Sequence, residues 1–464
     1  MRGIEGFVSL LKQFFPPDLD PHYLWALRVA VRETLEMAAG AMLCAGTAGL
    51  LLAIYIGARL PGWRILYALL ASFRAIPDIT LAILFVVTVG IGPPSGMLAL
   101  AAFYTAAMGK VFADLFNSAD PYPIDALLAT GAKPLTVACF GLLPLRSKDL
   151  LTYASYEFES KVRACMIVGA VGAGGLAGEL MGTINQLDYR RTSTLILLLL
   201  TLILLIDWMA RLARKHPALL LALLPLGVAS AWSNRPQMFG LSHTVAVVRS
   251  MLPPMLPPED IHALPRLIGE TLLIALGGTG LAVLLAVPMG TLAARNLAPG
   301  LIWFPTRRLL ELMRAIPDVI WGLLLVTTTV IGPVAGMLAI ALHSTGVFGK
   351  LYAESIENVQ PDPIRALQAT GGARLAVAGF GLLPLAFPPM AVHTLFRFEW
   401  NMRAASVVGI IGAGGIGQAL FNSQQLFFYN RMVAYLIVTW ALVMLMDLAN
   451  SQLRKRWRVT EGRI

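Results

Sequence analysis

Residues 407–420 read VVGIIGAGGIGQAL, and residues 167–180 read IVGAVGAGGLAGEL. The glycines between positions 412 and 417 fit G-x-G-x-x-G. This pattern is typical of a dinucleotide-binding turn when it lies between a strand and a helix and an acidic residue follows about 20 positions later. Both stretches instead follow a segment of helical length, and no acid in a strand pattern follows the second stretch at that distance. These glycines therefore do not indicate a nucleotide-binding enzyme.

The two glycine-rich stretches belong to a repeat that covers most of the chain. RAIPD occurs at residues 74–78 and again at residues 314–318, so equivalent residues lie 240 positions apart (314 − 74 = 240). The correspondence continues without a gap over residues 74–214 and 314–454. Upstream the offset shifts, because ETL begins at Glu33 and at Glu270 (270 − 33 = 237). An internal repeat of this kind indicates two tandem copies of one structural module.

The composition is that of a membrane protein. Charged residues make up 13% of the chain, whereas a typical soluble domain has about 25%. No charged side chain occurs in residues 79–109, 271–294, 319–349 and 404–430, and about 20 apolar residues suffice for a helix to cross a bilayer. The net charge of +10 comes from Lys and Arg at the ends of apolar runs, which follows the positive-inside rule and does not suggest nucleic acid binding. The sequence therefore predicts an all-α polytopic membrane protein.

The apolar runs predict eleven spans, five in each module and one linking crossing at residues 217–232. The positively charged ends of both modules are expected in the cytoplasm, which puts the N-terminus outside. We divide the chain into four parts: an N-terminal interfacial segment (1–32), the first module (33–216), a linking span with an external interfacial segment (217–262), and the second module (263–464). The two modules are expected to be related by a pseudo-twofold axis.

A polar loop of the same pattern occurs once in each module. Residues 125–144 read DALLATGAKPLTVACFGLLP, and residues 365–384 read RALQATGGARLAVAGFGLLP. Each loop predicts a short helix that ends at a glycine, because glycine readily adopts the left-handed conformation found after helix ends. Small residues on this helix would let it approach a partner closely.

These loops resemble the E-A-A-x3-G-x9-I-x-L-P loop of permease subunits in bacterial ATP-binding-cassette importers. RAIPD, Lys110 and Lys350, the FE…R pattern and the GAGG segments are similar to phosphonate importer permeases. The methionine and osmolyte importer permeases share the fold and the glycine segment but match RAIPD and FEWNMRAA (398–405) less well. The resemblance implies a fold of two MetI-like modules, in which each loop docks as a short helix onto a separate ATPase. The implied docking residues are Asp125, Ala126, Ala129, Gly131, Leu143 and Pro144 in the first copy and Arg365, Ala366, Ala369, Gly371, Leu383 and Pro384 in the second. Asp125 and Arg365 depart from the family's glutamate, and Gly141 and Gly381 stand where isoleucine is usual.

Charged residues also occur inside the fourth expected span of each module. Glu159 and Arg163 in the first copy, and Glu399 and Arg403 in the second, are spaced i, i+4 and so lie on one helix face. Ionisable residues at membrane depth usually face a bundle interior or a cavity. Two interpretations stay open: a buried pair that fixes helix packing, or a polar lining of the translocation pathway in which arginine meets an oxyanion.

The glycine segments are interpreted as a gate. Glycines permit close helix packing, or an unwound backbone where it lines a cavity. We expect both segments near the outer side, facing each other as a mobile constriction with backbone N–H groups available to an anion. The gate residues of this hypothesis are Gly172, Gly174, Gly175, Gly412, Gly414 and Gly415.

The sequence therefore predicts a multi-pass permease of the bacterial plasma (inner) membrane that imports phosphonate or a related phosphorus oxyanion. It contains no G-x-x-x-x-G-K-[ST] motif, so ATP and magnesium are expected on a partner and no cofactor or metal in this chain. The expected partners are two ATPase subunits and one external binding protein. The alternatives are an importer permease for methionine or an osmolyte, and, from other classes, a secondary transporter or a membrane enzyme. A secondary transporter would leave the paired loops unexplained, and no nucleophile or cofactor motif indicates an enzyme.

Overall fold

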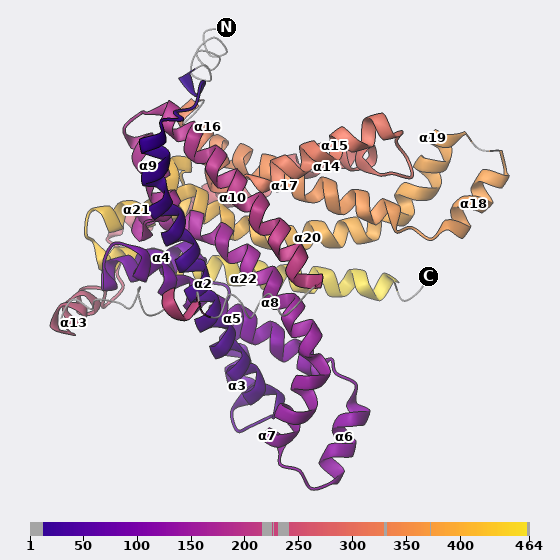
Figure 1. Cartoon of the computed structure of the whole chain (residues 1–464), viewed down its shortest axis with the longest axis horizontal. Coiled ribbons are helices and arrows are strands. Elements are labelled where there is room, and N and C mark those ends of the chain that lie inside the picture. The colour runs from indigo at the N-terminus through magenta and orange to yellow at the C-terminus, as the bar shows by residue number, and fades with distance from the viewer. Residues whose placement is uncertain are drawn as a thin grey trace. The chain divides into compact units, whose positions relative to one another are not determined.

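A computed structural model describes residues 13–215, 225, 227–230, 241–328, 332–371 and 373–461, and every regular element in these ranges is a helix. The chain divides into two compact units, Met1–Leu252 and Pro253–Ile464, each of which is described by itself (Figure 1). The division falls between the two modules expected from the repeat. Most of the linking crossing expected at residues 217–232 lies outside the described residues.

The first unit consists of α2 (Pro21–Gly57), α3 (Trp63–Phe73), α4 (Asp78–Val89), α5 (Pro93–Asn117), α6 (Pro121–Ala129), α7 (Pro134–Val137), η1 (Ala138–Leu142), α8 (Leu143–Val168), η2 (Gly169–Ala173), α9 (Gly175–Asn185), α10 (Tyr189–Lys215) and α13 (Leu241–Ser250). The second unit consists of α14 (Pro258–Ala293), α15 (Gly300–Ala315), α16 (Asp318–Thr328), α17 (Pro333–Glu357), α18 (Pro361–Ala369), α19 (Arg374–Val377), η3 (Ala378–Leu382), α20 (Leu383–Val408), η4 (Gly409–Ala413), α21 (Gly415–Gln425) and α22 (Tyr429–Glu461). From α14 onward the order of elements repeats that of the first unit from α2 onward.

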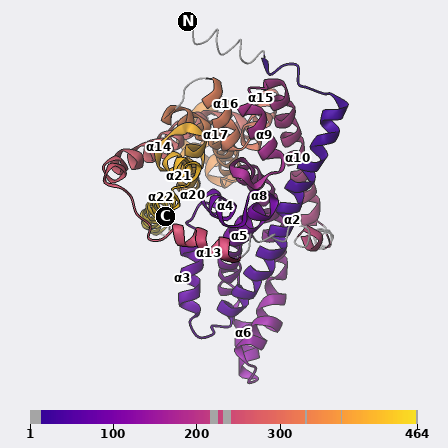
Figure 2. The same ribbon diagram turned by 90° about the vertical axis from the view of Figure 1, so that its left-hand side faces the viewer.

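The longest helix of each unit packs along the helix that follows the glycine-proline turn. In the first unit these are α2 and α5 (Figure 2), and in the second α14 and α17. Glycine brings the backbones together: a Cβ added at Gly49 of α2 would lie 3.0 Å from the backbone N of Gly109 on α5. Close contact through small residues is the usual way in which helices associate without a hydrophobic driving force from water.

Seven helices among the described residues are long and apolar enough to cross a membrane. They are Pro21–Gly57, Pro93–Asn117, Tyr189–Ile206, Pro258–Ala293, Pro333–Glu357, Ala378–Ala413 and Tyr429–Leu453. An eighth crossing results if α3 and α4, which are bent by 90° relative to each other, count as one span. The described helices thus fall short of the eleven crossings expected from the sequence.

Four expected spans are missing from the seven (11 − 7 = 4), and one of them is the linking crossing, most of which lies outside the described residues. The other three have physical causes. The second expected span of each module is a short helix, with 12 residues in α4 and 11 in α16. At a rise of 1.5 Å per residue such helices are about 18 Å long, too short for a hydrocarbon core of about 30 Å. In addition, α8 carries seven charged residues where the equivalent α20 carries three, and it is not among the helices apolar enough to cross a membrane.

The interfacial segments expected before each module are in part helical extensions of the first spans. Asp20 caps α2 by accepting the backbone N–H of His22 at 3.2 Å, and the helix then continues past Glu33 without a break. The stretch from residue 21 to residue 32 is therefore the first part of α2 and not a separate segment. Likewise α14 begins at Pro258, before the expected module boundary at residue 263, and accommodates Pro265.

An arginine at equivalent positions holds the start of each unit. Arg191 lies 3.2 Å from Asp18, and Arg431 lies 3.7 Å from Asp260. The backbone N–H of Asp20 and the guanidinium of Arg191 both donate to Asp18 and lower the pKa of its carboxyl. Because Asp18 and Asp260 do not occupy equivalent positions in the repeat, the two copies reach the same contact from different sequences.

Candidate functional site

The polar loops form the short helices that the sequence predicts. Figure 1 shows α6 at the end of the first unit that is farthest from α9, and α18 at the end of the second unit that is farthest from α21. Neither α6 nor α18 contains a buried residue. Gly131 and Gly371 follow these helices at φ +81° and +79°, the left-handed conformation expected of them. Asp125, Ala126 and Ala129, and their counterparts Arg365, Ala366 and Ala369, are all exposed.

The glycines at positions 141 and 381 explain how each loop helix is held. A Cβ at Gly141 would lie 2.8 Å from Leu127 and 3.2 Å from Ile124, the two residues through which α6 packs on its own unit. At Gly381 the corresponding distance to Ile364 is 3.3 Å. A larger residue at either position would push the loop helix outward, so the departure from isoleucine accommodates this packing. Leu143 with Pro144, and Leu383 with Pro384, then begin α8 and α20.

Each glycine segment turns the chain sharply between two helices. Gly172, Gly174 and Gly175 have φ of +108°, +79° and +69°. Gly412, Gly414 and Gly415 have φ of +101°, +90° and +71°, so the two copies adopt the same backbone path. Side chains other than glycine rarely adopt this region. The structure therefore requires glycine at these positions for the turn itself.

A cap from another helix holds the glycine segment in both units. In the first unit, Glu33 and Thr34 of α2 accept the backbone N–H groups of Gly175 and Leu176, each at 3.0 Å. We call this arrangement the cross-helix cap. The N–H groups of Gly175 and Leu176 are thus already hydrogen-bonded, whereas the gate hypothesis expects N–H groups of the glycine segment to be available to an anion. The ETL motif carries these residues, although the sequence alone revealed it only as a marker of the repeat.

The second unit forms the same cross-helix cap. Glu270 accepts the N–H of Gly415 at 2.9 Å, and Thr271 accepts that of Ile416 at 3.0 Å. Arg266 also lies 2.9 Å from Glu270, a contact that the first unit does not share because Val29 stands at the equivalent position. The shift of the repeat from 240 to 237 residues upstream therefore leaves the cap geometry unchanged.

Ala173 and Ala413 are fully buried in their own units. A Cβ at Gly96 would lie 2.7 Å from the Cβ of Ala173, and one at Gly336 would lie 2.8 Å from that of Ala413. Each alanine therefore packs against a glycine of its own unit.

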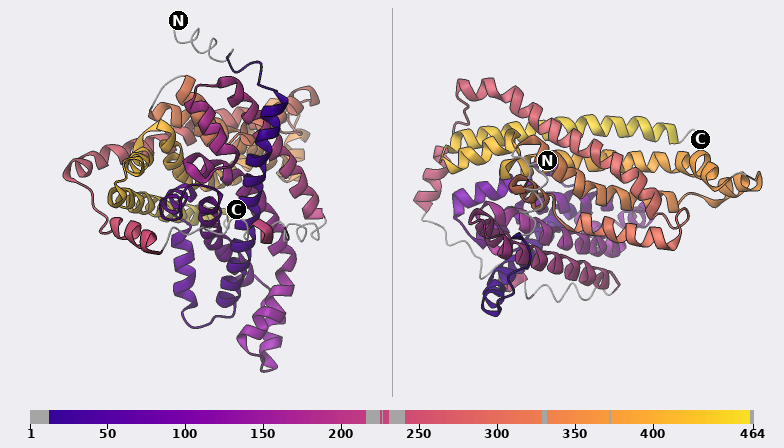
Figure 3. Two further views of the ribbon diagram at one scale, coloured as in Figure 1. Left: turned by 60° about the vertical axis from the view of Figure 1, so that its left-hand side comes forward. Right: turned by 90° about the horizontal axis from the view of Figure 1, so that it is seen from above.

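The intramembrane charged pair of the second copy is a three-residue cluster. Arg403 lies 2.8 Å from Glu399 and 3.0 Å from Asp447, and the side chains of Arg403 and Glu399 are each 8% exposed. Asp447 comes from α22, which runs along the second unit (Figure 3) and packs on α20. Two carboxylates thus engage Arg403, which favours the packing interpretation for this pair. Asp447 was missed, although an acid inside the apolar run of α22 was a visible signal.

In the first copy, Arg163 is partly buried, and the side chain of Glu159 lies outside the described part of the structure. A different charged residue, Lys161, is completely buried. Its Nζ lies 4.0 Å from Glu157, 3.3 Å from the sulfur of Met108 and 4.1 Å from the centre of the Tyr104 ring. The sequence shows Glu157 and Lys161 as further charged residues of the fourth expected span, but not their contacts with Met108 and Tyr104.

The position equivalent to Lys161 is Asn401, and its environment differs. Asn401 donates to Thr279 at 2.9 Å and accepts from Ser344 at 2.9 Å, so α20 is hydrogen-bonded to both α14 and α17. The two copies thus keep a buried polar group at this depth, charged in the first and neutral in the second.

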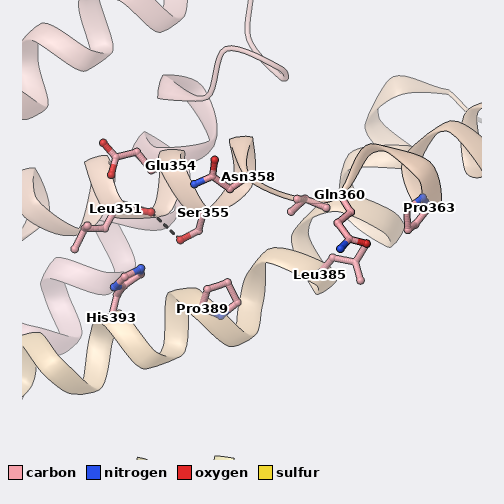
Figure 4. Close-up of a pocket in the computed structure, with 10 residues that line it drawn as sticks. Leu351, Glu354, Ser355, Asn358, Gln360, Pro363, Leu385, Pro389 and His393 are labelled. Atoms are coloured by element: carbon pink, nitrogen blue, oxygen red, sulfur yellow. Dashed lines mark hydrogen bonds between the residues drawn. The ribbon is translucent and has the colours of Figure 1, made fainter. Parts of the chain in front are cut away.

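A pocket of about 440 Å³ opens in the second unit beside α18 (Figure 4). Glu354 of α17 and Asn358, which follows the end of α17, line one side, and Pro389 and His393 of α20 line the other. The first unit differs beside its own loop helix, because Arg146 stands at the position equivalent to Ala386. Arg146 donates to the Ser118 carbonyl and lies 2.9 Å from Asp149. Among the described residues, no group of three His, Cys, Asp or Glu side chains could hold a metal ion.

Comparison with known proteins gives the family. Residues 45–216 and 286–459 both match the family described as the binding-protein-dependent transport system inner membrane component. The chain is 28% identical to the phosphate-import permease protein PhnE of Mycolicibacterium smegmatis, over 98% of this chain and 90% of that protein. It is 37% identical to the phosphite transport system permease protein PtxC of Stutzerimonas stutzeri, over 41% of this chain and 69% of that protein.

A solved structure of the MetNI methionine ABC transporter is similar over 44% of this chain and 99% of that chain, with 19% identity and a TM-score of 0.40. The family match extends over both halves of the repeat, as the sequence predicts. The helical architecture and the apolar spans agree with a multi-pass inner-membrane protein. The chain belongs to the family of binding-protein-dependent transport system inner membrane components, and it carries two copies of that family's module in tandem.

Proposed function

We propose that this permease carries a phosphorus oxyanion, such as phosphonate, phosphite or phosphate, across the membrane. The observation that supports the substrate class is the similarity, over 98% of the chain, to a phosphate-import permease, together with the similarity of one module to a phosphite permease. Methionine or an osmolyte is the alternative substrate, because a D-methionine permease of Haemophilus influenzae is also similar, at 24% identity.

The membrane subunit obtains its energy from ATPase partners, and we propose that α6 and α18 transmit it. Both helices expose their whole outer surface at one end of their unit, and both end at a left-handed glycine. One chain supplies two such helices, so it pairs with two ATPase subunits and one external binding protein. ATP and magnesium then bind to the ATPases.

We propose that the glycine segments form the gate on the side opposite the loop helices. Each segment lies at the other end of its unit from α6 or α18 (Figure 1). In the conformation described here, the cross-helix cap bonds each glycine segment to the first long helix of its own unit. The proposed polar residues of the translocation pathway between these two ends are Glu159, Arg163, Glu399 and Arg403. Of these, Arg403 forms ion pairs with Glu399 and Asp447.

Uptake by the complete transporter tests the substrate class. The permease, its ATPase and its binding protein would be reconstituted in proteoliposomes, and ATP-dependent uptake of phosphonate, phosphite and phosphate would be measured beside methionine and glycine betaine. We expect uptake of at least one phosphorus oxyanion and none of the two controls. Uptake of methionine alone would show that the substrate assignment is wrong, and uptake without any ATPase would favour a secondary transporter.

A further inference from the structure

The two loop helices are built alike but present different outer surfaces. Residues 121–131 read PYPIDALLATG, and residues 361–371 read PDPIRALQATG. They differ at three positions, and all six side chains at those positions are exposed. The six residues, in equivalent pairs, are Tyr122 and Asp362, Asp125 and Arg365, and Leu128 and Gln368.

The shared residues account for the fold of the helix. Ile124 and Leu127, and equally Ile364 and Leu367, pack against the glycine at position 141 or 381. The glycine that ends each helix is also shared. Because the packing residues are the same, the three substitutions change nothing inside either unit. The three substitutions therefore change only how the outer surface of each helix binds a partner.

The first outer surface is the more apolar of the two. Tyr122 is 81% exposed and Leu128 is 44% exposed. Asp125 adds one negative charge between them. Spacing of three residues puts these side chains along one stripe of the helix. Burying this stripe against a partner removes apolar surface from water, which favours binding in proportion to its area.

The second outer surface is polar and carries both charges. Arg365 lies 3.8 Å from Asp362, with side chains 74% and 90% exposed. Binding of a partner would have to strip water from this ion pair and from Gln368, and imperfect pairing of desolvated polar groups costs binding free energy. Arg365 also places a positive charge where the first surface has Asp125. Binding through the second surface therefore depends more on charge, and salt screens interactions between exposed charges.

We infer that the first loop helix supplies most of the affinity for the ATPase subunits, and that the second binds more weakly through a contact that salt weakens. This inference rests on the proposed function of the loops. Phe140 and Phe380, equivalent and 78% and 84% exposed, give both loops one apolar contact in common. The second site therefore still binds, with its strength set by the polar stripe.

Exchange of the three residues between the helices tests the inference with matched variants. In the first graft, Tyr122→Asp, Asp125→Arg and Leu128→Gln give α6 the second surface. In the second graft, Asp362→Tyr, Arg365→Asp and Gln368→Leu give α18 the first surface. Every introduced residue already occurs at the equivalent position of the other loop helix, and residues 121–131 and 361–371 are otherwise identical. Combining both grafts restores the composition of the natural chain.

Binding of the ATPase to the full-length permease in lipid nanodiscs would be titrated at low and at moderate salt. We expect two unequal sites in the natural chain, with affinities about tenfold or more apart, the effect of one buried apolar side chain. The first graft should leave two weak, salt-sensitive sites, and the second should produce two tight ones. The combined variant should again have one tight and one weak site.

Equal affinities in the natural chain, or grafts that leave both affinities unchanged, would overturn the inference while leaving the loops as the docking sites. If neither the natural chain nor the second graft binds the ATPase, the docking function of the loops itself is wrong. If salt weakens the site of the second surface no more than that of the first, the charge at Arg365 is not what sets its strength.

Discussion

Glu33 of α2 accepts the backbone N–H of Gly175 at 3.0 Å, although the two residues are 142 positions apart. Glu270 and Gly415 repeat this contact at 2.9 Å, and a threonine next to each glutamate caps the next N–H. The first turn of a helix has N–H groups without an intrahelical partner. Here α9 and α21 receive their cap from the first helix of the unit, because the preceding glycine leaves no side chain to supply it.

Removing the cap should destabilise the protein. Glu33→Ala or Glu270→Ala should each lower the free energy of unfolding by about 0.5–2 kcal/mol, the usual value of a helix N-cap. Chemical unfolding of the purified permease, followed by the loss of helical signal, would measure this. Glu36→Ala on the same helix is a suitable control, because Glu36 pairs at 3.5 Å with an Arg32 side chain that is 72% exposed. Equal effects of Glu33→Ala and Glu36→Ala would contradict a capping role.

The glycines within the segments should tolerate no side chain. Gly415→Ala puts a Cβ 2.5 Å from Thr271 Oγ1 at a φ of +71°, and Gly175→Ala meets Thr34 Oγ1 at 2.6 Å. We expect both variants to lose import through loss of the cap geometry. Gly182→Ala in α9 is the matched control, because nothing lies within 4 Å of its Cβ. It should import normally and be slightly more stable, since alanine favours helix by about 1 kcal/mol.

The gate hypothesis makes a separate prediction at Gly414. A Cβ there would lie 3.1 Å from the carboxylate of Glu270 at a φ of +90°, so Gly414→Leu should displace that carboxylate and fix the segment in another arrangement. Import should be blocked, whereas the basal ATPase activity of the assembled complex should persist because the loop helices are untouched. Both activities would be measured in the same proteoliposomes. Import at the normal rate would show that these glycines serve only packing.

The glycine that ends each loop helix should be required for its left-handed backbone conformation, and not because a side chain would clash with neighbouring atoms. Nothing lies within 4 Å of a Cβ at Gly131 or Gly371, and both have a φ near +80°. Gly131→Val should therefore strain the turn by about 1–2 kcal/mol and uncouple ATP hydrolysis from uptake. Gly131→Asn adds a side chain but tolerates this conformation, so it should preserve coupling. If the valine variant remains fully coupled, the turn does not transmit the ATPase movement.

Breaking the buried charge cluster should cost more than removing a surface pair. Arg403→Ala leaves Glu399 and Asp447 without their shared cation, which we expect to cost about 3–5 kcal/mol. Arg308→Ala removes a pair with Glu311 at 2.6 Å whose side chains are 57% and 38% exposed. It should cost no more than about 1 kcal/mol. Unfolding of both variants in the same detergent would compare them, and similar losses would argue against the packing role of Arg403.

The sequence predicted the parts of this protein that depend on local pattern and composition. The repeat, the helical membrane class, the loop helices and their terminal glycines follow from periodicity, from runs without charge and from the conformational preference of glycine. The resemblance of the loops to importer permeases also identified the family. The repeat is found by comparing the two halves of the sequence, and the other features are set within about twenty residues, the length of one span. The linear order of the chain is therefore enough to reveal them.

The tertiary structure alone decided which distant residues meet. It paired Glu33 with Gly175, placed Asp447 beside Arg403, and buried Lys161 against Met108 and Tyr104. It also showed that α4 and α16, the described helices at the second expected span of each module, are shorter than a membrane crossing requires. Contacts between segments more than 40 residues apart depend on how helices rotate and cross when they pack. Helical periodicity gives the face of each residue but not its neighbour, and that choice is made only when whole helix surfaces fit together.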